Sequence, residues 1–362
     1  MSVKEQEPFS HAEVDRGRRY HRPRYRALVA DLALSLAVLG VFAAWRPDLG
    51  LRPWLEAPAV TALVLVSAAL VRLPLSWWSG YVHEHRWGLS TQTPGGWLAD
   101  RAKALGVGVV LTAAATTGLV AIARSAPTWW PLVAAAAGAL LVLVLGFLAP
   151  VVLEPLFNRF RPLDDGELRR SLLALADRAG APVRDVLVAD ASRRTTKTNA
   201  YVSGIGRTRR VVLYDTFLAA ADPAAIGVVA AHELAHRRER HVAKLTLLGM
   251  AGAAAAVLVL WAVLGHRVAN PDWIPVALLV LALLELVATP ALAWVSRRYE
   301  RDADRIALEV TRDPAAFERA FRTLADTNVA DLDPPRLVRA LLLTHPPLPE
   351  RIEAGRRWSR AG

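Results

Sequence analysis

Residues 232–236, with the sequence HELAH, have the spacing of a metal-binding helix. On an α-helix, side chains four residues apart lie on one face, so His232 and His236 can reach the same divalent metal ion. Glu233 follows the first histidine directly, where its carboxylate can take a proton from a metal-bound water instead of binding the metal. The alternative is a charged helix whose histidines simply face solvent. The pattern favours metal-assisted hydrolysis.

The residues before this pattern predict the helix that must carry it. Asp222 and Pro223 are typical of an N-cap followed by proline in the first turn, and the apolar run 224–231 then leads to His232. Charged residues 237–240 follow at once, so the apolar part of this helix is far too short to cross a membrane. We therefore expect the metal at the edge of a membrane and not at its middle.

A third protein ligand is expected, because catalytic zinc usually has three and leaves one position for water. Glu300 and Asp304 are four residues apart, so one could bind the metal while the other supports a histidine ligand. An ordinary charged helix beside a membrane would show the same pair. The chain has no cysteine, so histidines and carboxylates must hold any metal, and this donor set favours zinc.

Composition indicates a membrane protein. Apolar residues make up 54% of the chain, above the soluble norm, and they are concentrated in blocks long enough to cross a bilayer. The formal net charge is +11, but arginines cluster between the apolar blocks and no basic stripe is interleaved with stacking aromatics. Lipid is therefore the expected partner, and nucleic acid is not. The six blocks are 28–45, 57–79, 104–123, 131–153, 245–265 and 273–295.

The distribution of arginine predicts the orientation of these spans. An even number of spans places both termini on one side of the membrane. Residues 1–27, 80–103, 154–244 and the tail from Arg297 are rich in arginine, whereas the other loops are short and have one or two each. The arginine-rich set should be cytoplasmic. Because the chain has four lysines against 40 arginines, we expect a bacterial host and its plasma membrane.

Between the fourth and fifth blocks, the pattern predicts a small folded unit. Residues 165–179 are typical of an amphipathic helix, and 183–188, 200–203 and 209–214 alternate as short strands do. A glycine-rich turn at 204–206 would join the last two strands. These elements lead directly into the metal helix.

Seven stretches of the chain match one known family in the same order. Together they resemble the Ste24-type CAAX prenyl proteases, membrane zinc metalloproteases of family M48 that are related to the HtpX-type quality-control proteases. The resemblance implies a mainly α fold, a polytopic membrane helical bundle with a cytoplasmic zincin (gluzincin) domain that contains a small β-sheet. The matching stretches are 81–93, 154–158, 199–204, 212–216, 232–236, 300–304 and 344–351.

The resemblance also implies roles for individual residues. It places one Zn²⁺ on His232, His236 and Glu300, with Glu233 as the general base. Asp304 matches the family's second acidic position, which is described as a proton donor or as a carboxylate that orients a histidine.

Three further residues match groups on the substrate side of the family's site. Asn199 matches an asparagine beside the substrate, and His345 and Arg351 match groups that hold the peptide and steady the oxyanion. Without the resemblance, we would interpret His345 as a residue just before a helix and Arg351 as a charged surface residue.

The same resemblance divides the chain into five parts. They are a basic cytoplasmic arm at 1–27, which we expect to be disordered; a four-helix membrane region at 28–153; the first part of the protease domain at 154–244; spanning helices five and six at 245–296; and the second part of the protease domain at 297–362. Eukaryotic members carry seven spanning helices, and here the arm stands where their first helix would be.

Other polar residues fit less direct roles. His241 lies five residues after His236, about 140° further around a continuous helix, so it should face away from the metal and play a supporting part. We interpret His83 and His85 as structural residues of a loop and not as a second metal site. Arg72 should extend to the membrane surface, whereas Glu285, deeper in the sixth block, should line a polar chamber.

The sequence therefore predicts a membrane-embedded zinc metalloendopeptidase that hydrolyses membrane-associated or CAAX-type substrates by zinc-activated water. One alternative is an HtpX-like quality-control protease of broad specificity, which only its substrates would distinguish. A non-catalytic membrane scaffold is less favoured, because such a protein would more naturally have lost a ligand or Glu233.

Overall fold

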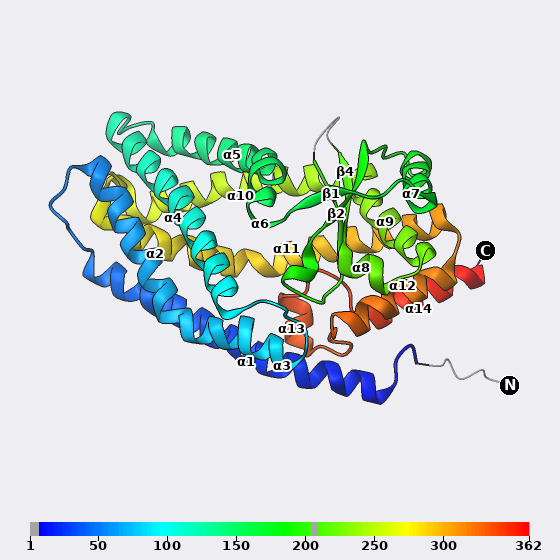
Figure 1. Cartoon of the computed structure of the whole chain (residues 1–362). Helices are drawn as coiled ribbons and strands as arrows, with labels where there is room; N and C mark the ends of the chain where they lie inside the picture. The colour runs from blue at the N-terminus through cyan, green and yellow to red at the C-terminus, as the bar shows by residue number, and fades with distance from the viewer. Residues whose placement is uncertain (1–6, 205–208, 362) are drawn as a thin grey trace.

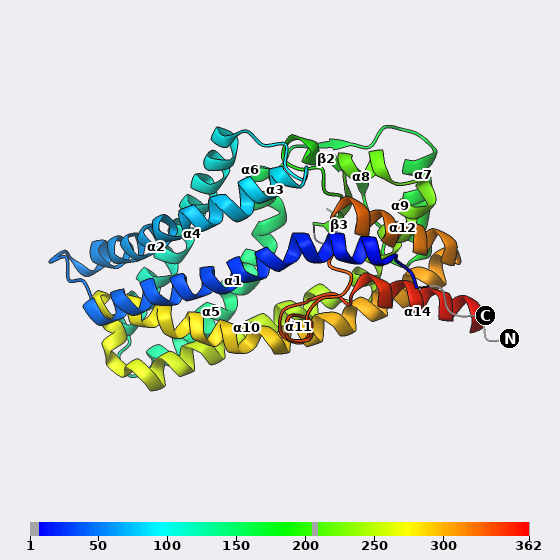
Figure 2. The same cartoon turned by 90° about the horizontal axis from the view of Figure 1, so that it is seen from below.

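The computed structural model describes residues 7–204 and 209–361. Parts of the expected basic arm and of the glycine-rich turn lie outside these residues. Figure 1 shows the long helices gathered at one end of the molecule, with the sheet and most short helices at the other. Figure 2, seen from below, shows that α1 and α11 run from one end into the other. The helices are α1 (His11–Trp45), α2 (Pro53–Trp77), α3 (His83–Arg86), α4 (Pro94–Ser125), α5 (Trp130–Leu148), α6 (Glu154–Phe157), α7 (Glu167–Arg178), α8 (Asp215–Ala220), α9 (Pro223–Arg238), α10 (His241–Leu264), α11 (Ile274–Thr311), α12 (Pro314–Thr327), α13 (Arg336–Leu341) and α14 (Leu348–Ala361).

Six helices in the described part of the chain are long and apolar enough to cross a membrane. They coincide with the six apolar blocks, which confirms that prediction. In each of them most of the apolar stretch is left unburied by the rest of the protein, as expected for a surface that lipid covers. One-turn π-helices at Trp78–Val82 and Ala149–Leu153 extend α2 into α3 and α5 into α6.

The N-terminal segment was wrongly expected to be disordered. Residues 11–27 form the first half of α1, which begins with a capping box: Glu13 N–H donates to Ser10 Oγ at 3.3 Å, and Ser10 N–H donates to the Glu13 carboxylate at 2.7 Å. This half of α1 packs against the end of α12, where Arg16 pairs with Asp326, and against the segment after it, where Tyr25 Oη donates to Asp331 at 2.6 Å. The segment is ordered by long-range polar contacts, which its low apolar content did not reveal.

The four-stranded sheet has the order β1 (Phe160–Pro162), β2 (Asp185–Ala189), β4 (Arg210–Tyr214) and β3 (Ala200–Ser203). β2 and β4 are parallel, and the outer strands pair antiparallel to their neighbours. β2, β3 and β4 match the predicted strands, while β1 was not predicted. β3 is therefore an edge strand, and it packs beside α9.

The helix α9 forms as its sequence predicts. Asp222 caps it by accepting the Ala225 N–H at 2.9 Å, and Pro223 occupies the first turn. Its small residues let it pack closely between the sheet and α11. Ala235 is fully buried there and contacts Ala303 and Ile306 of α11. This close packing brings the histidine face of α9 against α11.

Two charged residues inside the spans behave differently. Arg72 was expected to extend to the membrane surface, but it forms a bidentate pair with Asp31 of α1, with Nε–Oδ1 and Nη2–Oδ2 distances of 2.8 and 2.5 Å. The partner lies 41 residues away, so no local pattern in the sequence indicates it. Glu285 lies on an exposed face of α11, and its place in a polar chamber stays a prediction.

Candidate active site

The helices α9 and α11 bring His232, His236 and Glu300 together. His232 Nε2 lies 3.3 Å from His236 Nε2 and 3.3 Å from Glu300 Oε2, and His236 Nε2 lies 3.4 Å from Glu300 Oε1. Zinc binds such atoms at about 2.0–2.1 Å in a tetrahedral arrangement, which separates any two ligand atoms by about 3.3 Å. Each histidine Nε2 thus lies at the separation of two metal ligands from one Glu300 oxygen, His232 from Oε2 and His236 from Oε1, and the three residues could hold a metal ion.

The environment of Glu300 fits a bound cation as well. Its side chain is buried, and Oε2 accepts no hydrogen bond within the described structure, with Arg351 Nη2 3.7 Å away. A buried carboxylate oxygen without a partner is costly, and a divalent ion would remove that cost. Donor type, spacing and the unpaired oxygen therefore agree on a metal position among these three residues.

Asp304 contacts His232 at Nδ1, the ring nitrogen that is not among the three metal donors. It lies one turn after Glu300 on α11, and its Oδ1 is 2.9 Å from His232 Nδ1. This contact keeps the ring proton on Nδ1, so Nε2 is free to bind a metal. The packing of α11 thus separates the two acidic residues: Glu300 faces the Nε2 atoms, and Asp304 faces the opposite side of the ring.

Arg351 of α14 completes this support. Its guanidinium is buried and donates to Asp304 through Nε at 2.8 Å and Nη2 at 2.5 Å, and it stacks on the ring of Phe321. Burial by itself would lower the pKa of His232, but the carboxylates of Asp304 and Glu300 outweigh it and raise that pKa to about 9. The surroundings therefore favour a positive charge at this ring, whether from a proton or from a metal.

His241 supports the second histidine, as the expected supporting part implies, but it does not face away from the site. Its Nδ1 lies 3.0 Å from His236 Nδ1, and its buried ring stacks on Tyr299. The expectation that His241 faces away assumed one continuous helix. Instead α9 ends at Arg238, Arg240 has a left-handed backbone with φ of 57°, and α10 begins at His241. The turn returns His241 to the back of His236.

Glu233 lies beside the three donors on α9 and is partly buried. Burial raises the pKa of Glu233 above the usual value for a glutamate. A raised pKa makes a carboxylate a better base near neutral pH and a better acid once it holds the proton. The residue therefore has properties suited to proton transfer.

The remaining predicted residues lie in different places. His345 is exposed, and its Nε2 is 3.2 Å from Glu300 Oε1, so it lies at the open side of the donor group. Arg351 is buried and paired with Asp304, and its Nη2 also lies 3.7 Å from Glu300 Oε2 and 3.5 Å from His232 Nε2. Asn199 is exposed one residue before β3, where its Oδ1 accepts the Ala200 N–H at 2.9 Å. The structure thus brings both His345 and Arg351 to Glu300 and puts Asn199 just before the edge strand.

Comparisons with known proteins agree with this arrangement. Residues 162–359 match peptidase family M48, and residues 16–159 match the family described as CAAX prenyl protease N-terminal, five membrane helices. The chain is 32% identical over 330 residues to the Bacillus subtilis protein named uncharacterized metalloprotease YhfN, covering 84% of this chain and 76% of that protein.

Plant and yeast relatives carry more specific names. The chain is 30% identical to the CAAX prenyl protease 1 homolog of Arabidopsis thaliana over 85% of this chain and 76% of that protein. It is 33% identical to CAAX prenyl protease 1 of Saccharomyces cerevisiae over 50% and 40% respectively.

A solved structure shares the fold. The crystal structure of S. mikatae Ste24p superposes with a TM-score of 0.77 at 22% identity, covering 96% of this chain and 89% of that one. The expected fold of a membrane helical bundle with a small sheet is confirmed. The chain therefore belongs to the membrane CAAX prenyl protease branch of peptidase family M48 and is a metalloprotease.

Proposed function

We propose that the chain is a zinc endopeptidase whose site is built from His232, His236 and Glu300. The observation that carries this proposal is the meeting of two histidine nitrogens with the buried Glu300 carboxylate: the two Nε2 atoms lie 3.3 Å apart, and each lies 3.3–3.4 Å from one carboxylate oxygen. Bound there, zinc would supply a water molecule acidic enough to attack a peptide bond near neutral pH. One ion per chain satisfies these donors.

Glu233 acts as the general base. It accepts the proton of the attacking water, because it directly follows His232 on α9 and feels the charges of His232, His236 and Glu300. Its raised pKa lets it hold that proton and then deliver it to the leaving amine. Removal of this carboxylate should leave the metal donors intact.

Substrate binds along β3. This strand is at the edge of the sheet and packs beside α9, so its free backbone groups can pair with an extended peptide and hold the scissile bond over the site. Asn199 at the start of the strand and His345 at the open side of the donors are positioned to contact that peptide. Arg351 acts indirectly, by holding Asp304 against His232.

The substrates are membrane-associated proteins or peptides, including prenylated CAAX-type tails. Two observations support this: the spans continue directly into the site through α11, and several relatives are named CAAX prenyl protease 1. The arginine-rich segments, which include the protease domain, face the cytoplasm.

The test uses protein purified in detergent, with its metal content measured. A farnesylated CAAX peptide, its unprenylated twin and an unfolded membrane protein are offered under equal conditions. We expect wild-type protein with zinc to cleave, and Glu233→Gln to keep its zinc while turnover falls about 10²–10⁴-fold. Normal turnover in Glu233→Gln would contradict the proposed base.

The three substrates also separate the specificities. Strict dependence on the prenyl group supports the narrow activity. Efficient cleavage of the unfolded membrane protein, without preference for the prenylated peptide, would instead establish the broad quality-control activity.

A further inference from the structure

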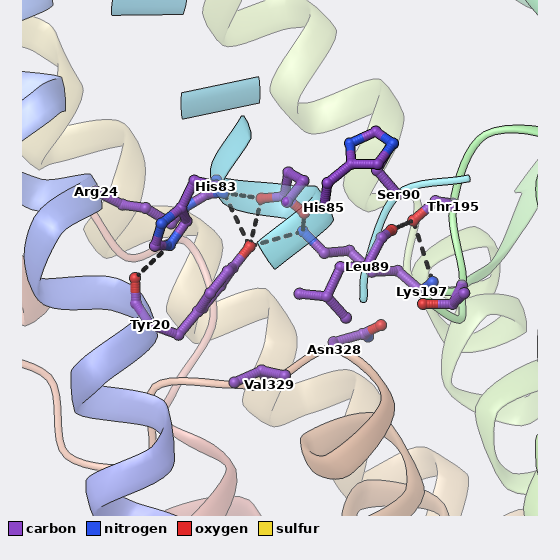
Figure 3. Close-up of polar contacts among 12 residues, drawn as sticks. Tyr20, Arg24, His83, His85, Leu89, Ser90, Thr195, Lys197, Asn328 and Val329 are labelled. Carbon is purple, nitrogen blue, oxygen red and sulfur yellow. Dashed lines mark hydrogen bonds and ion pairs between the residues drawn. The ribbon is translucent and has the colours of Figure 1, made fainter. Parts of the chain in front are cut away.

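Outside the metal site, three side chains from two distant parts of the chain meet at Glu84 of α3: Tyr20 and Arg24 of α1, and Lys197. Its carboxylate accepts Tyr20 Oη at 2.5 Å and Lys197 Nζ at 2.7 Å, and it also pairs with Arg24 of α1. Lys197 Nζ lies 3.0 Å from Tyr20 Oη as well, and the contacts around Tyr20 can be followed in Figure 3. Glu84 and Tyr20 are buried, so these charge-assisted bonds are shielded from water.

This cluster lies next to the edge strand in sequence and in space. Lys197 is three residues before β3, and the segment that contains it is bonded to the loop after α3. Thr91 N–H donates to Arg194 O at 3.1 Å, and Thr195 Oγ1 donates to Leu89 O at 2.7 Å. The approach of the chain to β3 is therefore fixed against the loop that joins the second and third spans.

The far end of β3 has a second attachment to the membrane region. Ser203, the last residue of the strand, donates its hydroxyl to the carboxylate of Glu154 at 2.9 Å. Glu154 begins α6, directly after the fourth span. In the next strand, Arg210 Nη2 donates to Pro150 O at 3.1 Å. The chain at both sides of β3 is thus bonded to a glutamate that follows a membrane helix: Lys197, three residues before the strand, to Glu84, and Ser203, its last residue, to Glu154.

We propose that Glu84 and Glu154 are positioning residues, which hold the substrate strand β3 at its two ends and so let the membrane helices set the register of the peptide over the metal site. This inference rests on the proposed function, in which β3 binds the peptide. A four-residue edge strand paired on one side would otherwise shift and fray easily. A displacement of about 1 Å at a reacting bond can lower the rate by about 10²-fold.

The test compares variants at each end of β3. Lys197→Met removes the ammonium group that bonds Glu84 while Arg24 still pairs with that carboxylate. Lys197→Arg keeps the charge. Ser203→Ala removes the bond to Glu154 at the other end. Arg72→Met is the matched control, because it breaks an ion pair between two spans without touching β3.

Each protein is assayed with zinc bound, on an unstructured reporter peptide that the wild type cuts at one mapped bond. We expect Lys197→Met and Ser203→Ala to keep zinc, to lose about tenfold or more in kcat/KM, and to cut at neighbouring bonds as well. Lys197→Arg should restore single-bond cleavage, and Arg72→Met should retain it. Hydrogen exchange at Ala200–Ser203 should accelerate in the first two variants and not in the control.

The outcomes separate this inference from the proposed function. A zinc-loaded wild type that cuts nothing would refute the proposed function, while faster exchange at β3 in the two variants would still support the attachment. Wild-type cleavage position, wild-type kcat/KM and unchanged exchange in Lys197→Met and Ser203→Ala would overturn the positioning role. Should Lys197→Met fail to fold, Ser203→Ala alone decides, because it removes one hydroxyl.

Discussion

Replacing Asp304 with asparagine separates two roles for this residue, proton donor and orienting carboxylate. Asp304 accepts His232 Nδ1–H and forms a bidentate pair with Arg351. Asparagine keeps the size and one acceptor oxygen but loses the negative charge. If Asp304 orients His232, zinc should bind about 10–100-fold more weakly, which is typical for the loss of such a partner and corresponds to about 1.4–2.7 kcal/mol.

The same substitution should lower stability, because it takes from the buried Arg351 guanidinium the carboxylate to which it donates two hydrogen bonds. Breaking a buried pair by removing one partner costs about 3–5 kcal/mol. Adding Arg351→Met removes the stranded charge, so the double variant should unfold at a higher temperature than Asp304→Asn alone. Its zinc affinity should remain low, since His232 still lacks its carboxylate.

The assay measures zinc affinity by competition with a chelator of known affinity, and turnover separately at saturating zinc. The orienting role predicts weaker zinc binding, with much of the activity recovered when zinc is saturating. Wild-type zinc affinity together with a collapse of turnover at saturating zinc would refute this reasoning and assign Asp304 a direct proton transfer.

Three further predictions concern the back of the site, its pH dependence and its orientation. His241→Ala should weaken zinc binding about tenfold, because it removes the hydrogen-bond acceptor of His236, and His241→Gln should weaken it less. Equal zinc affinities in both variants and the wild type would show that His241 does not support His236. In the metal-free protein a proton occupies His232 below its pKa of about 9, and zinc must displace that proton. The apparent zinc affinity should therefore fall about tenfold as the pH is lowered from 8 to 7. A zinc affinity that does not change with pH in a chelator competition would contradict this prediction. Reporter fusions after Arg26 and at the C-terminus should both report the cytoplasm and a fusion near Asp272 the other side, whereas a cytoplasmic report at Asp272 would reverse the proposed orientation.

Local features of this protein could be predicted from its sequence. The two histidines share a helical face because the period of the helix sets their spacing, and Asp222 and Pro223 start that helix through interactions within one turn. The six spans follow from apolar length alone, since no water in the bilayer can satisfy an open backbone. In each case the residues that determine the feature lie within about 20 positions of it in the chain.

Tertiary structure decided everything that depends on partners distant in the chain. Glu300 and Asp304 have equivalent spacing, and only the packing of α9 on α11 directs one to the Nε2 atoms and the other to Nδ1. The N-terminal half of α1 has few apolar residues, and it is ordered by bonds to residues 300 positions away. The end of α9 at Arg238 returned His241 to the site, because a left-handed residue broke the period that the sequence argument had assumed.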